Sequence, residues 1–594
     1  MCGITGWLLP PGAELSPAVL DRLSESIRHR GPDDAGQYCN PAAGLALAQR
    51  RLSIIDLSPG GHQPMIHADT GDVLVFNGEI YNFRELRTQL EYQGCRFRSS
   101  SDTEVLLQGL AVWGLRSCLK RLRGMYAFAW WQAAECALHL ARDPLGIKPL
   151  YYGEPLCGAG FVFASEIKAF LSLPGFARQV DRRALGQFLE FGYTFEAERT
   201  IFAGIHKLPP GHLLTVRAGV AGLLERFFTP EVRVDESRTS EDWQEELYAT
   251  LCQVVAEHLI ADVPVGLLLS GGLDSSLVAA LAVRSVPVRT VCMGFADSAV
   301  DERPHAREVA RFIGAEHEEV LIKPGEIQNM LEGAAVDFDD LFADWGTIST
   351  RLLYQKCWER GIKVVIVGEG SDELFGGYGV FRRSQSRAPR DWWLFQLYRN
   401  YCGRRYGHYF GAFRARMRAY LDATGDDRFA AIRLFESREQ LPNNYVMKVD
   451  KASMAASVEA RTPFLDQRVA EIAYRIPARH LLSAESEKEV LRRMAGRYRL
   501  LPEATLCRRK FGASIVASWM DESESFRCYA RDIILAPGGW TEALGLDGAM
   551  RDYFLRGRNG YPFPWAISIF SNLAWRLLTL ELWARVYEIA ARDA

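Results

Sequence analysis

Val265-Gly266-Leu267-Leu268-Leu269-Ser270-Gly271-Gly272-Leu273-Asp274-Ser275-Ser276 is the stretch that decides the fold of the second half of this chain. It joins a short apolar run to a two-glycine turn and the start of a helical pattern. Successive glycines let the backbone bend until several N–H groups converge, and the following helix N-terminus adds its positive dipole end. The stretch therefore predicts a phosphate-binding turn between a strand and a helix, with hydroxyl donors at Ser270 and Ser275.

The chemistry of this turn differs from that of the common nucleotide-binding loop. No lysine follows the glycines, so the turn is not the G-x-x-x-x-G-K-[ST] loop that holds β- and γ-phosphates. Asp274 would repel a bare phosphate group, and a shared Mg²⁺ ion removes that repulsion. We therefore expect Mg²⁺ and a pyrophosphate group at residues Ser270, Gly271, Gly272, Asp274 and Ser275.

A second motif follows the apolar run at residues 364–367. It reads Gly368-Glu369-Gly370-Ser371-Asp372-Glu373 and continues as Leu374-Phe375-Gly376-Gly377-Tyr378. Carboxylates at the carboxyl end of a parallel strand lie where open α/β sheets bind their ligands. Here they could hold Mg²⁺ or act as a base toward an incoming amine. Acids also gather at helix N-termini because of the dipole alone, but the glycines on both sides favour a site.

The chain around these motifs alternates helical patterns with short apolar runs from about residue 241 onward. The runs cover residues 265–269, 288–293, 319–322 and 363–367. Such alternation predicts a parallel sheet covered by helices, and the pattern after about residue 440 is mostly helical. Residues 563–590 are the best candidate for a membrane span, but Asn572 and three charged residues interrupt them. A span needs about 20 apolar residues, so we expect an amphipathic helix and no membrane partner.

The first 190 residues show short strands separated by glycine, proline and asparagine turns. Candidate strands lie at residues 72–78, 126–130 and 160–163, and helical patterns follow Asn82 and cover residues 103–113. This density predicts stacked antiparallel sheets flanked by helices. We place a first domain at residues 2–190, a connecting segment that packs between the halves at 191–235, and a second domain at 236–594.

Cys2 is the candidate nucleophile of the first half. Removal of Met1 would leave its thiol beside a free α-amino group, whose ordinary pKa of about 7.7–8.0 suits a general base near neutral pH. One residue could then supply both nucleophile and base, as in N-terminal nucleophile enzymes. A chance cysteine among the twelve of this chain is the alternative at this point.

The composition limits the partners and the compartment. A net charge of −3 gives no general attraction to nucleic acid or to anionic membranes. The twelve cysteines form no C-x-x-C pair, which indicates a reducing compartment rather than disulfides or a zinc site. No basic and apolar leader opens the chain, so we expect a cytoplasmic location and small-molecule substrates. A homodimer is compatible with the sequence.

Residues 379–440 receive no assigned role. The part from 379 to 420 holds ten arginines among aromatic residues such as Trp392 and Tyr398. Arginine stems lying over packed aromatic side chains explain this composition. A nucleic-acid surface is the alternative, but no nucleic-acid-binding module signature accompanies it.

Together these motifs are similar to those of the glutamine-hydrolysing asparagine synthetases, over nearly the whole chain. The resemblance implies a class II glutamine amidotransferase domain of the N-terminal nucleophile type, followed by a PP-loop ATP pyrophosphatase domain. The matches are Cys2-Gly3-Ile4, His29-Arg30-Gly31-Pro32-Asp33, Arg51-Leu52-Ser53-Ile54-Ile55-Asp56, Gln63-Pro64-Met65, Asn77-Gly78-Glu79-Ile80-Tyr81-Asn82, Ser101-Asp102-Thr103-Glu104, Val449-Asp450-Lys451-Ala452-Ser453-Met454, Val458-Glu459-Ala460-Arg461-Thr462-Pro463-Phe464-Leu465-Asp466 and Arg509-Lys510, besides the two motifs quoted above.

The resemblance also implies roles for residues of the first half. Cys2 would attack the side-chain amide of glutamine. Asn77 and the Gly78 N–H would form the oxyanion hole, in which one donor stabilises the transition state by about 2.7–4 kcal/mol. Arg51 would bind the α-carboxylate of glutamine in bidentate geometry, and Asp102 its α-ammonium group. The pocket would be completed by Leu52, Ser53, Ile54, Ile55 and Glu79.

In the second half the resemblance implies an ATP site with Mg²⁺. Contacts to AMP would come from Leu268, Met293, Val367 and Gly368, with Val367 contributing through its backbone. Pyrophosphate would contact the 270–275 turn and Lys488, and Mg²⁺ would be held by Asp274 and Asp372. Glu369 would assist the attack of ammonia on an acyl-adenylate.

The implied reaction converts L-aspartate, L-glutamine, ATP and water to L-asparagine, L-glutamate, AMP and diphosphate, with ammonia passing through the protein. One alternative keeps this chemistry with another carboxylate acceptor. A second, closer to the β-lactam synthetases, uses an internal amine and no glutamine, and the set Cys2, Arg51, Asn77 and Asp102 argues against it. A third is a non-catalytic protein on the same fold, which intact motifs in both halves disfavour.

Overall fold

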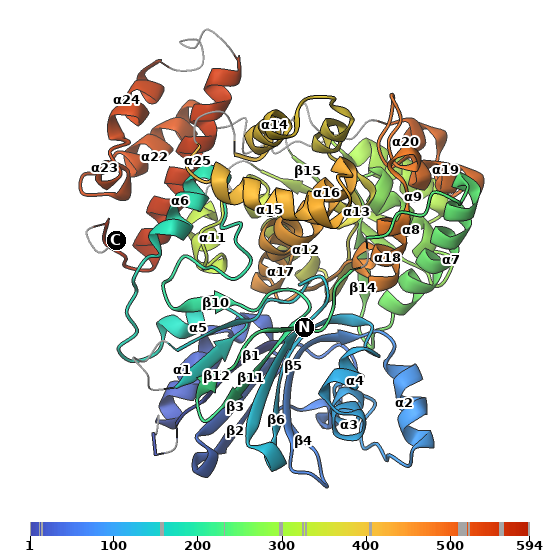
Figure 1. Cartoon of the computed structure of the whole chain (residues 1–594), viewed down its shortest axis with the longest axis vertical. Coiled ribbons are helices and arrows are strands. Elements are labelled where there is room, and N and C mark those ends of the chain that lie inside the picture. The colour runs from blue at the N-terminus through green and yellow to red at the C-terminus, as the bar shows by residue number, and fades with distance from the viewer. Residues whose placement is uncertain are drawn as a thin grey trace.

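The computed structural model divides the chain into a half dominated by strands and a half dominated by helices (Figure 1). It describes residues 2–10, 12–13, 16–154, 160–230, 232–295, 301–323, 326, 329–402, 407–508, 520, 523–556 and 564–591, with backbone alone for 564–570. The predicted motif residues Arg509 and Lys510 lie outside the described residues. In Figure 1 the start of the chain lies near the junction of the two halves.

Two antiparallel sheets build the N-terminal half, as predicted. The first has the order β10-β8-β9-β1-β3-β2, and the second has the order β12-β11-β7-β6-β5-β4 with β13 on β11. Ile4 and Leu47 of the first sheet share a buried core with Val75 and Ala129 of the second, so the sheets are stacked face to face. The strands are β1 Gly3–Leu8, β2 Asp34–Asn40, β3 Leu45–Arg51, β4 Met65–Ile66, β5 Val73–Ile80, β6 Gly124–Gln132, β7 Ala137–Arg142, β8 Tyr151–Gly153 and β9 Phe161–Ala164, then β10 Ile205–Lys207, β11 His212–Arg217, β12 Val220–Ala221 and β13 Glu225–Arg226.

Helices cover the outer faces of both sheets. Helix α1 (Pro17–Ser26) lies against β1 and β3, where Leu20 and Ala48 belong to one buried core. Helices α2 (Phe83–Tyr92) and α3 (Asp102–Trp113) lie on the other sheet, where Leu86 and Leu110 belong to one buried core with Phe76. The strands and helices predicted for this half agree with these elements.

Strands β10 to β13 come from the predicted connecting segment, residues 191–235. β10 pairs with β8 of the first sheet, and β11 pairs with β7 of the second. Residues 205–226 therefore extend both N-terminal sheets. We propose that the N-terminal domain continues at least to Arg226.

The C-terminal half is organised around one parallel sheet of five strands, β16-β15-β14-β17-β18. Four of these strands fall on the predicted apolar runs: β14 Val265–Leu268, β15 Arg289–Phe295, β16 Glu316–Ile322 and β17 Val364–Ile366. The fifth, β18 (Glu459–Arg461), lies in a region predicted to be mostly helical. The chain order reverses at β14, so the carboxyl ends of β14 and β17 meet at the switch point where open sheets bind ligands.

Helices surround this sheet. Those used below are α7 Ser240–His258, α8 Leu273–Ala282, α9 Arg303–Ile313, α11 Leu331–Asp337, α12 Thr347–Trp358, α13 Ser371–Phe375, η6 Glu436–Tyr445, α17 Val446–Ala455 and α19 Glu489–Arg497. The arginine-rich segment forms α14 (Arg390–Cys402) and α15 (Phe410–Ala423), where Trp393 and Tyr398 are buried. Arg428 lies 4.9 Å from the Trp393 ring centroid, in agreement with the packing interpretation.

The last helix, α25 (Pro564–Val586), packs against α11 and α22 (Glu524–Ile534). Within the described part of the chain, no helix combines the length and the apolar character that a membrane crossing requires.

Candidate active sites

The first candidate site forms where the two N-terminal sheets meet. Cys2 precedes β1, and its backbone N–H donates a 3.0 Å hydrogen bond to Oδ1 of Asn77 on β5 of the other sheet. This bond fixes the orientation of the Asn77 amide. Among the described residues, Nδ2 of Asn77 is buried and has no hydrogen-bond partner. A buried donor without a partner costs free energy, so Asn77 offers a preformed donor to an oxyanion.

The Cys2 thiol is enclosed by the loop that follows β3. Burial raises the pKa of this thiol, while the Leu52 backbone N–H and the Arg51 charge favour the thiolate. The buried Arg51 guanidinium donates to the carbonyl oxygens of Ile55 at 3.2 Å and Ser58 at 3.3 Å. These bonds shape the loop at residues 52–58. The structure thus brings Cys2, Asn77, Arg51 and Leu52 together.

Two acidic residues predicted for the glutamine pocket are also buried. Asp102 at the start of α3 accepts a 3.0 Å hydrogen bond from the Ile80 backbone N–H, and burial raises the pKa of its carboxyl group to about 6. Glu79 lies 3.4 Å from the Arg461 guanidinium, and burial followed by the Glu459 charge raises its pKa.

Arg461 belongs to β18 of the C-terminal sheet and has no predicted role. Its Nε donates to Glu459 at 2.6 Å, and one of its terminal nitrogens donates to the carbonyl oxygens of His258 and Ile260, both at 2.7 Å. The C-terminal half therefore contributes a charged strand to the surroundings of Glu79, a residue of the predicted glutamine pocket. Sequence pattern alone could mark this strand as a family motif, but its contact with Glu79 depends on the tertiary fold.

Arg30 connects the nucleophile to the C-terminal half. Its Nε donates to the Cys2 carbonyl oxygen at 3.1 Å, and its terminal nitrogens lie 2.7 Å from Glu166 and 2.9 Å from Asp450 on α17. Lys148 lies 3.5 Å from the same Asp450. All four side chains are buried, so each charge depends on its partners. A single arginine thus joins Cys2 to a helix of the other half.

The second candidate site is the predicted phosphate turn between β14 and α8. Ser270 and Ser275 place their hydroxyl oxygens 2.9 Å apart, and the Gly272 N–H donates to Ser270 Oγ at 3.2 Å. Gly271 has a φ of +70°, and a Cβ there would lie 2.6 Å from the Ala306 backbone nitrogen. A side chain at this position would therefore disrupt the turn.

The two synthetase motifs are in direct contact. A Cβ on Gly368, which follows β17, would lie 2.9 Å from the Ser275 backbone nitrogen. Ser371 donates a 2.8 Å hydrogen bond to Oδ1 of Asp274. The carboxyl ends of β14 and β17 thus hold one shared site, as the strand order predicts.

Lys488 lies at the centre of this site. Its Nζ is 2.6 Å from Asp274 and 2.7 Å from Asp372. Burial lowers the pKa of Lys488, whereas the two carboxylates raise it by more, so this pKa lies above its usual value. Both carboxylates therefore face one point, and an all-oxygen set of this kind suits Mg²⁺ bound together with phosphate oxygens. Within the described residues, no group of three or more His, Cys, Asp or Glu side chains could hold a metal ion by itself.

A cavity of about 130 Å³ opens beside this group. It is lined by Ser270, Gly272, Leu273, Asp274, Glu302, Gly377, Glu487, Lys488, Arg492 and Arg508. Sequence reasoning missed the lining role of Glu302, Glu487, Arg492 and Arg508, because no local pattern distinguishes them from surface charges. Leu268, Met293 and Val367 lie at or near the carboxyl ends of the neighbouring strands β14, β15 and β17 but do not line this cavity.

Glu373 is a further buried acid of the second motif that received no predicted role. Burial, followed by the Asp372 charge, raises the pKa of its carboxyl group to about 8. Tyr378 donates a 2.7 Å hydrogen bond to one of its oxygens. Glu369 of the same motif precedes α13 and is half-buried. The motif therefore places the carboxyl groups of Glu369 and Glu373 in different environments.

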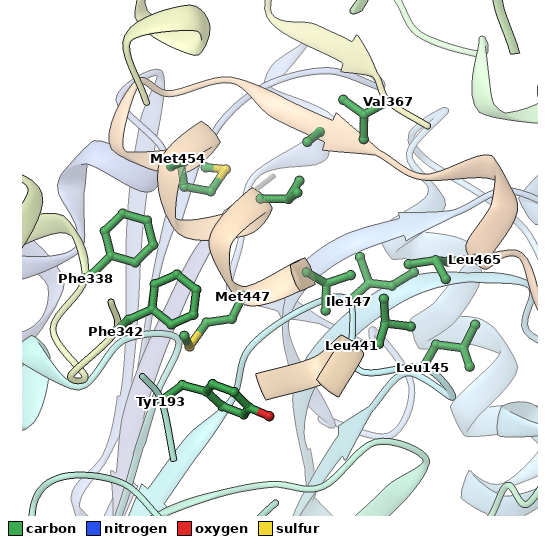
Figure 2. Close-up of a cluster of buried hydrophobic side chains, with 14 of the residues drawn as sticks. Leu145, Ile147, Tyr193, Phe338, Phe342, Val367, Leu441, Met447, Met454 and Leu465 are labelled. Atoms are coloured by element: carbon green, nitrogen blue, oxygen red, sulfur yellow. The ribbon is translucent and has the colours of Figure 1, made fainter. Parts of the chain in front are cut away.

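An apolar cluster lies between the halves (Figure 2). Leu145 and Ile147 come from the N-terminal half, and Leu441, Met447 and Met454 come from η6 and α17. Phe338, Phe342 and Val367 extend the cluster, and Val367 immediately precedes Gly368 of the ATP motif. Buried apolar side chains exclude water and stabilise no ion.

A stacked-sheet domain with a thiol at residue 2, followed by a parallel sheet with a Ser-Gly-Gly-x-Asp-Ser turn, defines a class of glutamine-dependent, ATP-using ligases that form carbon–nitrogen bonds. Comparison with known proteins assigns the family. Residues 1–228 match the family of glutamine amidotransferase domains, and residues 246–585 match the asparagine synthase family. The chain belongs to the asparagine synthase family and is a glutamine-hydrolysing carbon–nitrogen ligase.

Its relatives include proteins from bacteria and fungi. It is 33% identical to a Mycobacterium tuberculosis protein provisionally named a glutamine-hydrolyzing asparagine synthetase, across 99% of this chain and 97% of that protein. It is 30% identical to glutamine-hydrolyzing asparagine synthetase 1 of Bacillus subtilis, across 88% of each chain. Amidase chyE of Penicillium rubens is 33% identical across 66% of this chain and 61% of its own.

Proposed function

We propose that this chain is an asparagine synthetase that transfers nitrogen from glutamine to L-aspartate, with cleavage of ATP to AMP and diphosphate. The observation that supports the proposal is that one chain holds a buried Cys2 hydrogen-bonded to Asn77 and a two-glycine turn with facing serine hydroxyls, with a buried apolar cluster between the halves (Figure 2).

Glutamine hydrolysis is proposed to take place at Cys2. After removal of Met1, the α-amine of Cys2 accepts the thiol proton, and the thiolate attacks the side-chain amide carbon of glutamine. Asn77 Nδ2 and the Gly78 N–H stabilise the oxyanion. Arg51 binds the α-carboxylate and Asp102 binds the α-ammonium group. The remaining contacts come from Glu79 and the backbone at Leu52, Ser53, Ile54 and Ile55.

The released ammonia is proposed to pass along the apolar cluster. Ammonia in bulk water is mostly protonated and then has no lone pair for attack. A path lined by Leu145, Ile147, Met447 and Val367 provides no partner for the ammonium ion, and therefore favours neutral ammonia. Its end at Val367 lies beside Glu369, the proposed assistant of the attack.

Activation of the acceptor is proposed to take place at the switch point of the parallel sheet. The turn at Ser270, Gly271, Gly272 and Ser275 binds the phosphates, with Lys488 beside it and Leu268, Met293, Val367 and Gly368 around the adenosine part. Asp274 and Asp372 would hold Mg²⁺, which neutralises the departing diphosphate when bound. The acceptor carboxylate attacks the α-phosphorus and releases diphosphate. Ammonia then attacks the acyl carbon and releases AMP.

A second candidate function keeps this chemistry with a carboxylate acceptor other than aspartate. We also propose a compartment and an oligomeric state. The eleven described cysteines are all free thiols, which supports a cytoplasmic location. We propose separately that the chain forms a homodimer.

The proposed function is tested by diphosphate release from ATP and Mg²⁺ with L-aspartate and either glutamine or ammonium. We expect diphosphate, AMP and asparagine in equal amounts with aspartate. A chain that releases diphosphate with another carboxylic acid and not with aspartate would support the second candidate instead.

A further inference from the structure

Residues 258–262 of the C-terminal half are docked on the N-terminal half. They begin at the end of α7 and lead into β14. The His258 ring stacks on Tyr81 with 3.8 Å between ring centroids, and both side chains are buried. The carbonyl oxygens of His258 and Ile260 accept hydrogen bonds from the buried Arg461, both at 2.7 Å. The position of residues 258–262 is therefore fixed by contacts from both halves.

Asp262 ends this segment and contacts the loop at residues 52–58 twice. Its carboxylate accepts a 2.8 Å hydrogen bond from the Asp56 backbone N–H, and its own N–H donates to the Ile54 carbonyl oxygen at 2.9 Å. Two hydrogen bonds to residues two positions apart fix both the place and the direction of this backbone stretch. Because Asp262 is exposed, its side chain makes this contact without contributing to a buried core.

Asp56 has a backbone conformation that its hydrogen bonds must stabilise. Its φ is +57°, in the left-handed region that residues other than glycine rarely adopt. Its carboxylate accepts from the Ser58 N–H at 3.0 Å and the Ser100 N–H at 2.8 Å, and its carbonyl oxygen accepts from the Arg51 guanidinium at 2.5 Å. The backbone N–H completes this set with its hydrogen bond to Asp262. A strained residue that bonds to Arg51 is thus held by the C-terminal half.

The other side of the loop is also held from the C-terminal half. Asp33 accepts from the Ser53 N–H at 2.9 Å, and its own N–H donates to the Arg51 carbonyl oxygen at 3.0 Å. Lys363, directly before β17, lies 2.9 Å from the Asp33 carboxylate. This second contact is indirect, because Asp33 stands between the lysine and the loop. Asp262, in contrast, bonds to the loop itself.

We propose that Asp262 is a positioning residue for glutamine binding at the N-terminal site. It acts through the backbone of Ile54 and Asp56, and thereby holds in place the Arg51 guanidinium and the proposed backbone contacts at residues 52–55. Asp262 itself does not touch the substrate. The inference rests on the proposed function and adds a residue of the C-terminal half to the support of the glutamine pocket.

The expected consequence is a loss of glutamine affinity and not of catalytic rate. Cys2 is placed by β1 and by its hydrogen bond to Asn77, and neither contact involves Asp262. Leu52, whose N–H faces the thiol, lies on the side of the loop that Asp33 holds. The nucleophile and the oxyanion donor therefore keep their geometry when Asp262 is replaced. A less ordered loop must be ordered by the substrate, which raises KM and leaves kcat unchanged.

Glutamate release by the full chain, with glutamine as the varied substrate, measures this effect. Asp262→Ala should raise KM for glutamine about 10-fold and change kcat less than about 2-fold. Asp262→Asn keeps an oxygen that accepts from the Asp56 N–H, so its KM should stay within about 3-fold of the wild-type value. Ammonium-dependent diphosphate release with ATP, Mg²⁺ and L-aspartate should be unchanged in both variants.

Equilibrium binding separates affinity from turnover. The Cys2→Ala chain lacks the nucleophile, so calorimetry can measure its Kd for glutamine. Addition of Asp262→Ala to this chain should raise the Kd about 10-fold, in parallel with the change in KM.

Asp235→Ala is the matched control. The Asp235 carboxylate accepts from the Ser237 N–H at 3.0 Å and its own N–H donates to the Arg475 carbonyl oxygen at 2.9 Å, the same pattern in contacts away from the loop. Its replacement should leave KM for glutamine unchanged.

Three outcomes are decisive. An unchanged KM and Kd in the Asp262→Ala chains would overturn the inference. An equal loss of glutamine-dependent and ammonium-dependent activity would assign Asp262 a general structural role and overturn it as well. A Cys2→Ala chain that still releases glutamate would instead overturn the proposed function.

Discussion

The two active sites of this chain are assembled in opposite ways. At the first, Cys2 and Asn77 are joined by a hydrogen bond between two stacked sheets, and the Asn77 amide already presents a buried donor. At the second, Asp274, Asp372 and Lys488 lie on loops and helix starts at one end of a parallel sheet, and opposite charges hold them together. The first candidate site thus holds an unpartnered donor, whereas the second is a set of opposite charges that neutralise one another.

The largest expected effect is the loss of glutamine-dependent amidation when the Cys2 thiol is removed. Cys2→Ala removes the nucleophile, so glutamine-dependent amidation should fall at least about 10⁴-fold, while ammonium-dependent amidation continues. The check is glutamate and amide production with each nitrogen source. Loss of both activities would contradict the assignment of separate sites.

The second prediction concerns the buried link between the halves. Asp450→Asn removes a negative charge that neutralises the buried Arg30 and Lys148. The free energy of unfolding should therefore fall by about 3–5 kcal/mol. Chemical denaturation monitored by fluorescence measures this loss. Asp422→Asn is the control, because Asp422 is 71% exposed in its pair with Arg390 and its loss should cost about 1 kcal/mol or less. Equal effects of the two variants would refute a stabilising role for the link.

The third prediction tests the preformed donor. Asn77→Ala should reduce kcat for glutamine hydrolysis about 10²–10³-fold with little change in KM, because an oxyanion donor acts in the transition state. Steady-state glutaminase kinetics provide the measurement, and ammonium-dependent amidation is the internal control. A rise in KM alone would place Asn77 in ground-state binding.

The fourth prediction tests the charged site. Asp372→Asn removes one of the two carboxylates on Lys488 and one proposed Mg²⁺ ligand, so diphosphate release should fall about 10–100-fold and its Mg²⁺ requirement should rise. Glutaminase activity should persist. Unchanged diphosphate release over a Mg²⁺ titration would exclude Asp372 as a ligand.

The smallest effect is a pH dependence of the first site. Asp102 is proposed to bind the ammonium group of glutamine in its ionised form, and burial raises the pKa of Asp102 to about 6. The ionised fraction falls as pH decreases through this value, so kcat/KM for glutamine should drop about 10-fold between pH 7 and pH 5. Asp102→Asn should remove this step from the pH profile, and a variant profile that retains it would assign the titration to another group.

The sequence predicts those elements of the C-terminal half that follow from local patterns, but not a strand whose burial depends on distant partners. The strands at β14 to β17 and the Ser270–Ser275 turn are local patterns, since an apolar run, glycines and hydroxyls occur in succession. The strand β18 was missed because it has only three residues and two of them, Glu459 and Arg461, are charged. Their burial is compensated by partners far away in the sequence, such as Glu79.

The same limit applies to the sites. Cys2, Asn77, Arg51 and Asp102 were predicted through their motifs, and the structure places the first three around one thiol, but their catalytic roles remain predictions. The ion pair of Asp344 and Lys448 likewise joins residues 104 positions apart and depends on how α17 meets the loop at 338–346. Contacts of this kind follow from tertiary packing and leave no periodic signal in the chain.

The loop at 338–346 restricts how this enzyme could be rearranged by recombination. Ala343 bonds to Gly192, and the carboxylate of Asp340 accepts a hydrogen bond from the Ile201 N–H. Its position is thus set by residues that precede the parallel sheet in the chain. A synthetase half transplanted onto a foreign nitrogen donor would keep the Ser270–Ser275 turn but lose the support of the loop at 338–346. Successful exchange of partners would require residues 192–201 to travel with the synthetase half.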